Sequence, residues 1–193
     1  MRRLAAFEFL LVAILSFLPS SFATAGEVGA VCFVPGPQDC AAVVVGEIDR
    51  ATTSVLVLAY SFTHDGIAAA LVRAKGRGLD VRVILDKSNV CAGAEGPDDE
   101  EAQACRRKGS RIAETLAKGG VAVRIDRRHA IAHSKVMIID DRRVLTGSFN
   151  WTVAAATKNS ENLVVLDGAD VASLYAAEWA EHWSHSEPYG QGK

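Results

Sequence analysis

Short apolar runs alternate with segments of helical periodicity along the middle of this 193-residue chain, and this alternation restricts the fold that it can adopt. Residues 54–60 and 80–85 are apolar and partly β-branched, which is typical of buried strands. Residues 66–74 and 112–117 have apolar positions at helical spacing, and each segment is followed by glycines that can end a helix. Strands that alternate with helices form βαβ units, so the sequence predicts a largely parallel sheet with helices on both faces.

The alternation changes after Gly120. Three short apolar segments then follow without a helical segment between them, and Asp141-Arg142 has the polar character of a hairpin turn. The strands expected here are residues 121–125, 135–140, 144–146 and 162–166, and further helices are expected at 41–51 and 169–183. We therefore expect an α/β fold in which an α/β/α sandwich is built on a mixed sheet.

The first 25 residues have the features of a secretory signal peptide. Arg2 and Arg3 form a basic start, residues 9–18 are apolar, and Ala23-Thr24-Ala25 has the small residues of a cleavage site. The alternative is an uncleaved anchor, but the apolar run is shorter than the ~20 residues that a spanning helix needs. We expect cleavage after Ala25, one domain over residues 26–193, no stable membrane anchoring afterwards, and a secreted protein in a bacterial periplasm.

The four cysteines are Cys32, Cys40, Cys91 and Cys105. An even number in an exported chain favours disulfides over metal or catalytic thiols. The sequence permits three pairings and does not choose between them. We favour pairing of nearest neighbours, because each pair brackets a loop-like stretch. No histidine stands at a spacing that would complete a zinc site with these cysteines, so we expect neither a metal nor a cofactor.

A net charge of −2 gives the chain no overall attraction for nucleic acid. Local basic clusters would have to supply it, and the candidates are residues 106–108 with Arg111, and Arg124 with Arg127-Arg128. A solvated charged surface is the alternative for both. The second cluster lies just before His133, where an electropositive approach would favour an anionic substrate.

Residues 133–140 carry the pattern H-x-K-x-x-x-x-D, in which His133 and Lys135 are two residues apart. On a strand both side chains would leave the same face, where one phosphate could meet an imidazole and an ammonium. Ser148 and Asn150 share the same spacing, and the predicted hairpin brings them near. These four residues are the candidate catalytic and phosphate-binding set, since attack on a phosphodiester needs a nucleophile, an acid and cations.

Two carboxylates complete the candidate catalytic set. Asp140 belongs to the pattern, but it lies an odd number of residues from His133 and would face the opposite way on a strand. We therefore expect it to hold the turn or pair with a basic neighbour, not to act as acid or base. Glu161 is the candidate partner of His133, because a carboxylate on one imidazole nitrogen fixes the tautomer and raises the basicity of the other.

These residues resemble the signature of the phospholipase D superfamily, and in particular its small bacterial nucleases with one signature per chain. The resemblance includes Gly147-Ser148-x-Asn150, Ser160-Glu161-Asn162 and the strands at 59–63 and 81–86. It implies the phospholipase D-like fold and cleavage through a phosphohistidine without a metal. In that reaction one histidine attacks and a second one protonates the leaving group. A chain with one signature must then form a homodimer whose active site lies on the two-fold axis.

Other histidines and tryptophans have two interpretations each. His129 is a candidate phosphate ligand or a surface residue, and Trp151 is a candidate for stacking on a base or for packing under the hairpin. His64 follows a strand end and either lines the cleft or lies in a plain loop. We expect exposed side chains at His182 and His185. Trp179 and Trp183 are four residues apart, so we expect them on the buried face of the last helix.

The favoured function is that of an exported, metal-independent endonuclease for DNA, with RNA as a second substrate. A phospholipase D that acts on lipid head groups is the first alternative. The chain shows no basic amphipathic segment for docking on lipid, which disfavours that alternative. The second is a nucleic-acid-binding module that has lost catalysis, which the intact set of candidate residues disfavours.

Overall fold

The computed structural model describes residues 26–90 and 111–190. The expected signal peptide lies outside these residues, as do Cys91, Cys105 and the basic residues 106–108. None of the helices in the described ranges is long and apolar enough to cross a membrane.

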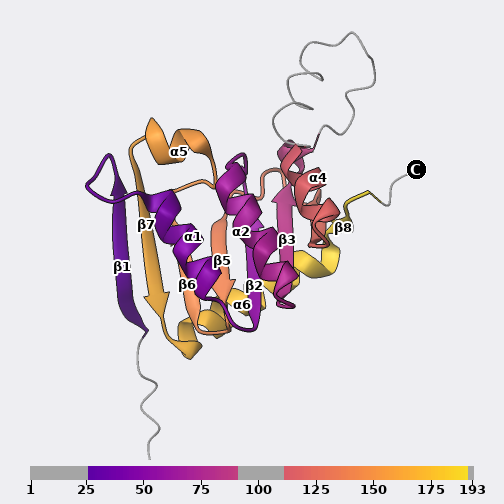
Figure 1. Cartoon of the computed structure of the whole chain (residues 1–193). Helices are drawn as coiled ribbons and strands as arrows, with labels where there is room; N and C mark the ends of the chain where they lie inside the picture. The colour runs from indigo at the N-terminus through magenta and orange to yellow at the C-terminus, as the bar shows by residue number, and fades with distance from the viewer. Residues whose placement is uncertain (1–25, 91–110, 191–193) are drawn as a thin grey trace, which may run out of the picture.

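The described residues form an eight-stranded mixed sheet (Figure 1). The three consecutive strands β2, β3 and β4 run parallel to one another, while all other neighbouring pairs are antiparallel. The order across the sheet is β1 (Glu27–Val34), β7 (Glu161–Asp167), β6 (Arg143–Gly147), β5 (Lys135–Ile139), β2 (Ser54–Ala59), β3 (Asp80–Asp86), β4 (Ala122–Asp126) and β8 (Glu187–Pro188). The prediction of a mixed sheet is therefore confirmed.

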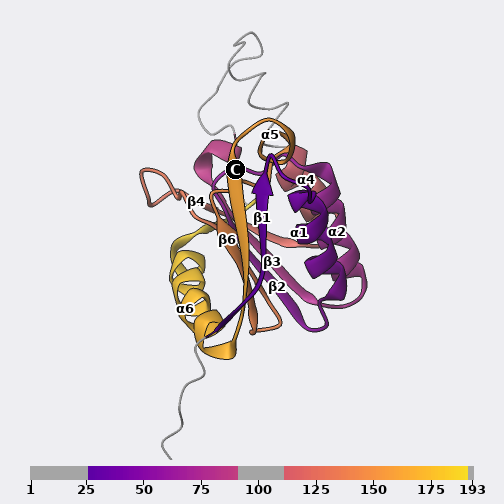
Figure 2. The same ribbon diagram turned by 90° about the vertical axis from the view of Figure 1, so that its left-hand side faces the viewer.

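Helices cover both faces of the sheet, which confirms the α/β/α sandwich (Figure 2). One face carries α1, α2 and α4, and the long helix α6 lies alone on the other, while α5 lies at the upper edge of the sheet (Figure 1). Their bounds are α1 Cys40–Arg50, α2 Asp65–Gly76, α4 Arg111–Lys118, α5 Val153–Thr157 and α6 Ala169–His185, and a 3-10 turn spans Lys87–Asn89.

Local signals explain why these helices form. Asp39 caps α1 by accepting hydrogen bonds from the backbone amides of Ala41 and Ala42. His64 caps α2 by accepting from the backbone N–H of Ile67, so this histidine belongs to a helix start and not to a plain loop. On α6, Trp179 and Trp183 stack with ring centroids 4.9 Å apart.

Side-chain alternation on the central strands divides the core into two layers. Val55 and Val57 of β2 belong to the large layer under α1 and α2, and Leu58 belongs to the smaller layer under α6. In that smaller layer the Trp179 indole donates to the backbone carbonyl of Val57 at 3.0 Å. The prediction that Trp179 faces the core is confirmed.

Strand β1 was not predicted from the sequence. It lies at the sheet edge, pairs with β7, and has mostly exposed side chains, so it lacks the apolar pattern of a buried strand. A disulfide between Cys32 and Cys40 links this strand to the start of α1. The expected pairing of the first two cysteines is confirmed, and the pairing of Cys91 with Cys105 stays a prediction.

Candidate active site at the edge of the sheet

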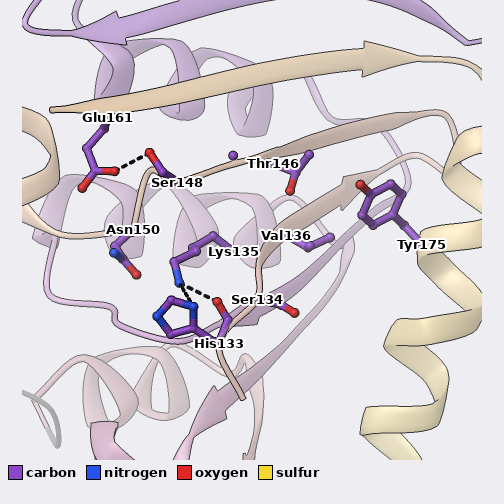
Figure 3. Close-up of a pocket in the computed structure, with 10 residues that line it drawn as sticks. His133, Ser134, Lys135, Val136, Thr146, Ser148, Asn150, Glu161 and Tyr175 are labelled. Carbon is purple, nitrogen blue, oxygen red and sulfur yellow. Dashed lines mark hydrogen bonds between the residues drawn. The ribbon is translucent and has the colours of Figure 1, made fainter. Parts of the chain in front are cut away.

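Four strand ends meet at one edge of the sheet. β5 runs antiparallel to β2, so its first residue, Lys135, pairs with Ala59 at the end of β2. β6 ends nearby at Gly147, and β7 begins at Glu161. A pocket of about 470 Å³ opens here (Figure 3), and its lining includes all of His133, Lys135, Ser148, Asn150 and Glu161. The fold thus brings together five of the six predicted catalytic residues.

His133 and Lys135 are in direct contact in this pocket. The Lys135 Nζ atom lies 3.1 Å from His133 Nδ1. This contact does not arise from the alternation of side chains along a strand, because His133 precedes β5 and only Lys135 lies on it. An ammonium can only donate, so Nδ1 accepts in this arrangement, and in the neutral ring the proton then lies on Nε2.

The two side chains differ in exposure. His133 is exposed to solvent, whereas Lys135 is only 7% exposed. Burial lowers the pKa of Lys135, and the negative charge of Glu161 partly opposes this. Solvation of the ammonium is poor at this position, which favours its interaction with an incoming anion.

Tyr60 supports both of these residues from the end of β2. Its ring centroid lies 4.3 Å from that of His133, and Lys135 Nζ lies 4.6 Å from the Tyr60 ring centroid in a cation–π contact. This role was not predicted, although Tyr60 is the last residue of a predicted strand. Tyr175, also not predicted, reaches the pocket from α6 (Figure 3).

Glu161 holds the opposite side of the pocket. Its carboxylate accepts a hydrogen bond from Ser148 Oγ at 2.5 Å and another from Asn159 Nδ2 at 2.8 Å. Ser148 Oγ in turn accepts from the Asn162 backbone N–H at 3.0 Å. Glu161 therefore pairs with Ser148 and not with His133, which was its expected partner. The reason is that Lys135 occupies the Nδ1 side of the His133 imidazole.

Gly147 sets the position of Ser148. Its φ of +144° is one that residues with a side chain rarely adopt, and a Cβ atom there would lie 2.4 Å from the backbone oxygen of Asn162. The glycine therefore permits close approach between β6 and β7. This packing explains how Ser148 reaches both Glu161 and Asn162.

The side chains of Asn150 and Trp151 lie in different environments. Asn150 lines the pocket, and its amide Oδ1 is buried without a hydrogen-bond partner among the described residues. Trp151 is fully buried, forms a β-bridge with Phe62, and contacts Phe149 edge-on at 6.2 Å between centroids. Stacking of Trp151 on a substrate base is therefore wrong for this structure, and the packing alternative holds.

Asp140 lies at the far end of β5 from the pocket. Its carboxylate accepts hydrogen bonds from the backbone amides of Thr52, Thr53 and Ser54 and from both threonine hydroxyls. Its φ of +53° places it in the turn after the strand. The structure does not bring Asp140 to the other candidate catalytic residues, and its contacts tie the turn to the start of β2.

His129 is not among the residues that line the pocket, and its role as a phosphate ligand stays a prediction. It contacts Asp126 at the end of β4, together with His182 and His185 of α6. Both α6 histidines have largely buried side chains, which corrects the expectation that they are exposed. Burial alone would raise the pKa of Asp126, but hydrogen bonds from the three histidines hold this pKa well below its ordinary value.

The basic cluster before His133 is largely paired. Arg124 donates to the Ser186 carbonyl, and Arg127 and Arg128 form ion pairs with Glu187 and with Glu181, respectively. These pairs reduce the positive potential that the cluster offers to a substrate. Among the predicted cationic groups that the structure describes, Lys135 lies in the pocket.

Comparison with known proteins agrees with this geometry. Residues 44–183 match the family described as cardiolipin synthase, PLD-like domain. The crystal structure of Nuc, a phospholipase D family member from Salmonella typhimurium, matches with a TM-score of 0.71 and 36% sequence identity, covering 85% of this chain and 98% of that one. The chain belongs to the phospholipase D superfamily.

Two further relatives also match this chain. Phospholipase D of Rickettsia bellii is 37% identical over 148 residues, which are 77% of this chain and 65% of that protein. Mitochondrial cardiolipin hydrolase of Xenopus tropicalis is 32% identical over 139 residues, which are 72% of this chain and 59% of that protein. The chain thus spans less than two thirds of the length of these two relatives. NucT from Helicobacter pylori, at 22% identity and a TM-score of 0.62, shares the fold.

Proposed function

We propose that this protein is an exported phosphodiesterase that hydrolyses DNA, and RNA as a second substrate, through a phosphohistidine. The observation that carries the proposal is the exposed His133 imidazole held 3.1 Å from the buried Lys135 ammonium in an open pocket. An exposed imidazole can reach a phosphorus atom, and the adjacent cation can neutralise the phosphoryl oxygens.

In the proposed reaction the Lys135 ammonium turns from His133 Nδ1 to the phosphoryl oxygens and the imidazole proton moves to Nδ1, which frees the lone pair of Nε2. Nε2 then forms a bond to phosphorus while the bond to the leaving oxygen breaks, and that oxygen takes a proton from a second histidine. Water then attacks the phosphohistidine, the P–N bond breaks, and the second histidine receives the proton from that water. Lys135 and the Asn150 amide line the same pocket and supply donors for the phosphoryl oxygens, and Ser148 supplies one when its hydroxyl turns from Glu161 to the phosphate. Glu161 positions Ser148 through the hydrogen bond between their side chains.

The second histidine must come from a second chain, because the signature occurs once. We propose a homodimer with two-fold symmetry in which two pockets face each other. Mixed dimers of wild type with His133→Ala test this arrangement. If each site needs both histidines, equal mixing leaves about one quarter of the dimers active, whereas independent sites would leave about half of the activity.

The name of one match favours nuclease activity, and the names of others favour a lipid substrate. Nuc, which this chain covers over 98% of its length, supports the nuclease proposal. The relatives named phospholipase D and mitochondrial cardiolipin hydrolase support lipid phosphodiesters as a second candidate. The open, shallow pocket carries charged and polar groups suited to the phosphate that both substrates share.

The deciding experiment is cleavage of plasmid DNA, of RNA and of phosphatidylcholine or cardiolipin vesicles by the purified protein in excess EDTA. His133→Ala is the active-site variant, and His64→Asn is the matched control, since asparagine can also cap a helix. Nucleic-acid cleavage that survives EDTA and is lost only in His133→Ala supports the proposal. Lipid hydrolysis with intact plasmid would establish the phospholipase alternative, and inactivity on all substrates would favour a binding module.

Export is part of the proposal. The disulfide between Cys32 and Cys40 is typical of proteins that fold in an oxidising compartment such as the bacterial periplasm. Fractionation of expressing cells, followed by sequencing of the mature N-terminus, tests both the compartment and cleavage after Ala25.

A further inference from the structure

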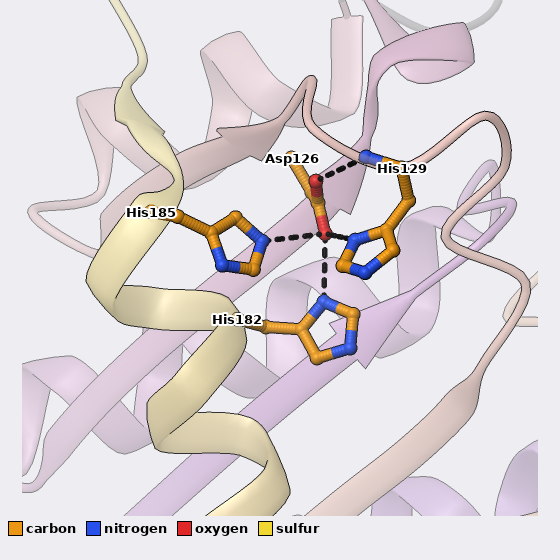
Figure 4. A group of neighbouring side chains, drawn as sticks. All are labelled: Asp126, His129, His182 and His185. Carbon is orange, nitrogen blue, oxygen red and sulfur yellow. Dashed lines mark hydrogen bonds and ion pairs between the residues drawn. The ribbon is translucent and has the colours of Figure 1, made fainter.

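Three imidazole rings converge on one carboxylate oxygen at the end of β4, in a group distinct from the pocket residues (Figure 4). Asp126 Oδ2 lies 2.9 Å from His129 Nδ1, 2.6 Å from His182 Nδ1 and 3.3 Å from His185 Nε2. The loop after β4 supplies one histidine and the end of α6 supplies two. All four candidate ligand atoms lie within 4.8 Å of one another.

This spacing is close to that of a tetrahedral metal site. With metal–ligand bonds of about 2.0–2.1 Å, tetrahedral zinc separates its ligand atoms by about 3.3 Å. The observed contacts to Asp126 Oδ2 are 2.6–3.3 Å, and the four ligand atoms lie within 4.8 Å of one another, so changes of up to about 1.5 Å in these separations would form a site for an ion. Imidazole nitrogens favour zinc and similar transition metals over calcium or magnesium, which prefer oxygen ligands.

Carboxylates lie near the far nitrogens of two of these imidazole rings. The other nitrogen of His182 lies 3.3 Å from Glu178, and that of His185 lies 3.4 Å from Glu181. A carboxylate on the far nitrogen fixes the tautomer of a metal-bound imidazole and raises its basicity. Each glutamate stands four residues before its histidine, so one helical turn builds both pairs.

The second carboxylate oxygen of Asp126 is held separately. Asp126 Oδ1 accepts from the backbone amides of Arg128 at 3.0 Å and His129 at 3.3 Å. These bonds leave Oδ2 aimed at the three rings. A carboxylate fixed in this way would present one oxygen to a cation.

We propose that Asp126, His129, His182 and His185 bind one divalent transition-metal ion, with zinc as the expected ion. Asp126 is fully buried, and the side chains of His182 and His185 are 8% and 11% exposed, while His129 at 41% leaves an entry path from solvent. Four protein ligands close the coordination sphere, which is typical of a structural site. The ion joins the end of α6 to the loop that leads to His133, and it takes no part in the reaction.

The alternative for this group is a hydrogen-bonded cluster in which all three rings donate to the carboxylate and no metal binds. Calorimetric titration of the purified, disulfide-bonded protein with Zn²⁺, and the visible spectrum of its Co²⁺ form, separate the two. The proposal expects one ion per chain, a four-coordinate Co²⁺ spectrum, and a zinc-dependent rise in unfolding temperature.

Variants locate the ion. Glu181→Gln keeps all four ligands and is expected to weaken zinc binding about 10–100-fold, while the metal-free protein still folds. His185→Gln and Asp126→Asn, which each remove a ligand, should weaken zinc binding further. His64→Asn and His133→Ala, which alter histidines elsewhere, should bind zinc as the wild type does.

Folded wild-type protein that binds no zinc would overturn the proposal. Zinc binding that survives in His185→Gln, or that is lost in His133→Ala, would place the ion elsewhere and would overturn it as well. Because Glu181→Gln retains every ligand, its affinity separates an effect on the ion from a failure to fold. These readouts do not use enzymatic activity, so they are independent of the proposed function.

Discussion

Replacement of Asp140 by asparagine should lower stability and leave catalysis intact. Asp140 belongs to the signature, but the structure places it at the end of β5 that is remote from the pocket, where its carboxylate accepts hydrogen bonds from residues 52–54. Asparagine also tolerates the left-handed backbone at φ +53°, so the substitution changes the acceptor and the charge without straining the turn.

The magnitude follows from the hydrogen bonds. One oxygen, Oδ2, accepts from the amide and hydroxyl of Thr52, both at 2.9 Å, and an amide nitrogen in its place cannot accept either. Two lost bonds at about 1 kcal/mol each predict that the free energy of unfolding falls by about 2 kcal/mol. Asp140→Ala loses all the bonds and strains the backbone, so its loss should be about 4 kcal/mol.

The effect should also depend on pH. Burial opposes ionisation, but hydrogen bonds from the backbone amides of Ser54, Thr53 and Thr52 hold the pKa of Asp140 well below its ordinary value. A lowered folded-state pKa stabilises the fold above the unfolded-state pKa of about 4, and this stabilisation is lost as the pH falls further. The difference between wild type and Asp140→Asn should therefore be complete at neutral pH and shrink in acid.

Urea unfolding from neutral to acidic pH, with nuclease assays under folding conditions, measures both effects. Asp141→Asn is the matched control, since Asp141 is exposed and shares the left-handed backbone at φ +50°. Unchanged stability of Asp140→Asn would refute the reasoning. A loss of activity by orders of magnitude in folded Asp140→Asn would show that this residue serves the chemistry.

Three further predictions concern the pocket and the core. Lys135→Gln removes the buried cation and should lower kcat/KM about 10²–10³-fold, measured on plasmid DNA; a smaller loss than tenfold would argue against phosphoryl contact. Glu161→Gln removes the negative charge that raises the pKa of Lys135, so Lys135 should lose its proton at lower pH. The alkaline limb of the pH–rate profile should then shift toward lower pH. An unshifted limb would contradict this coupling. Trp151→Ala should lower the free energy of unfolding, measured with urea, by about 3–5 kcal/mol, because Trp151 is fully buried. Trp151→Phe should bind substrate as tightly as the wild type. Weaker substrate binding by a folded Trp151→Phe would support the stacking role.

Local sequence patterns determined most of the fold. The apolar strands and amphipathic helices were predicted near their observed bounds, because burial on one or both faces leaves a periodic pattern in the chain. The signature likewise identified His133, Lys135, Ser148 and Asn150 as residues of one site, since they lie close to strand ends that pair directly. Strand β1 escaped prediction because an edge strand with exposed side chains carries no such pattern.

Only the tertiary structure decided which partners these residues meet. Glu161 contacts Ser148 instead of His133, and Trp151 is buried, because both outcomes depend on how β6 and β7 pack. Asp126 and His182 are 56 residues apart in the chain, so no local spacing in the sequence predicts the cluster that they form. Periodicity records whether a side chain is buried, but convergence of distant side chains depends on the order of strands in the sheet and on where α6 crosses them.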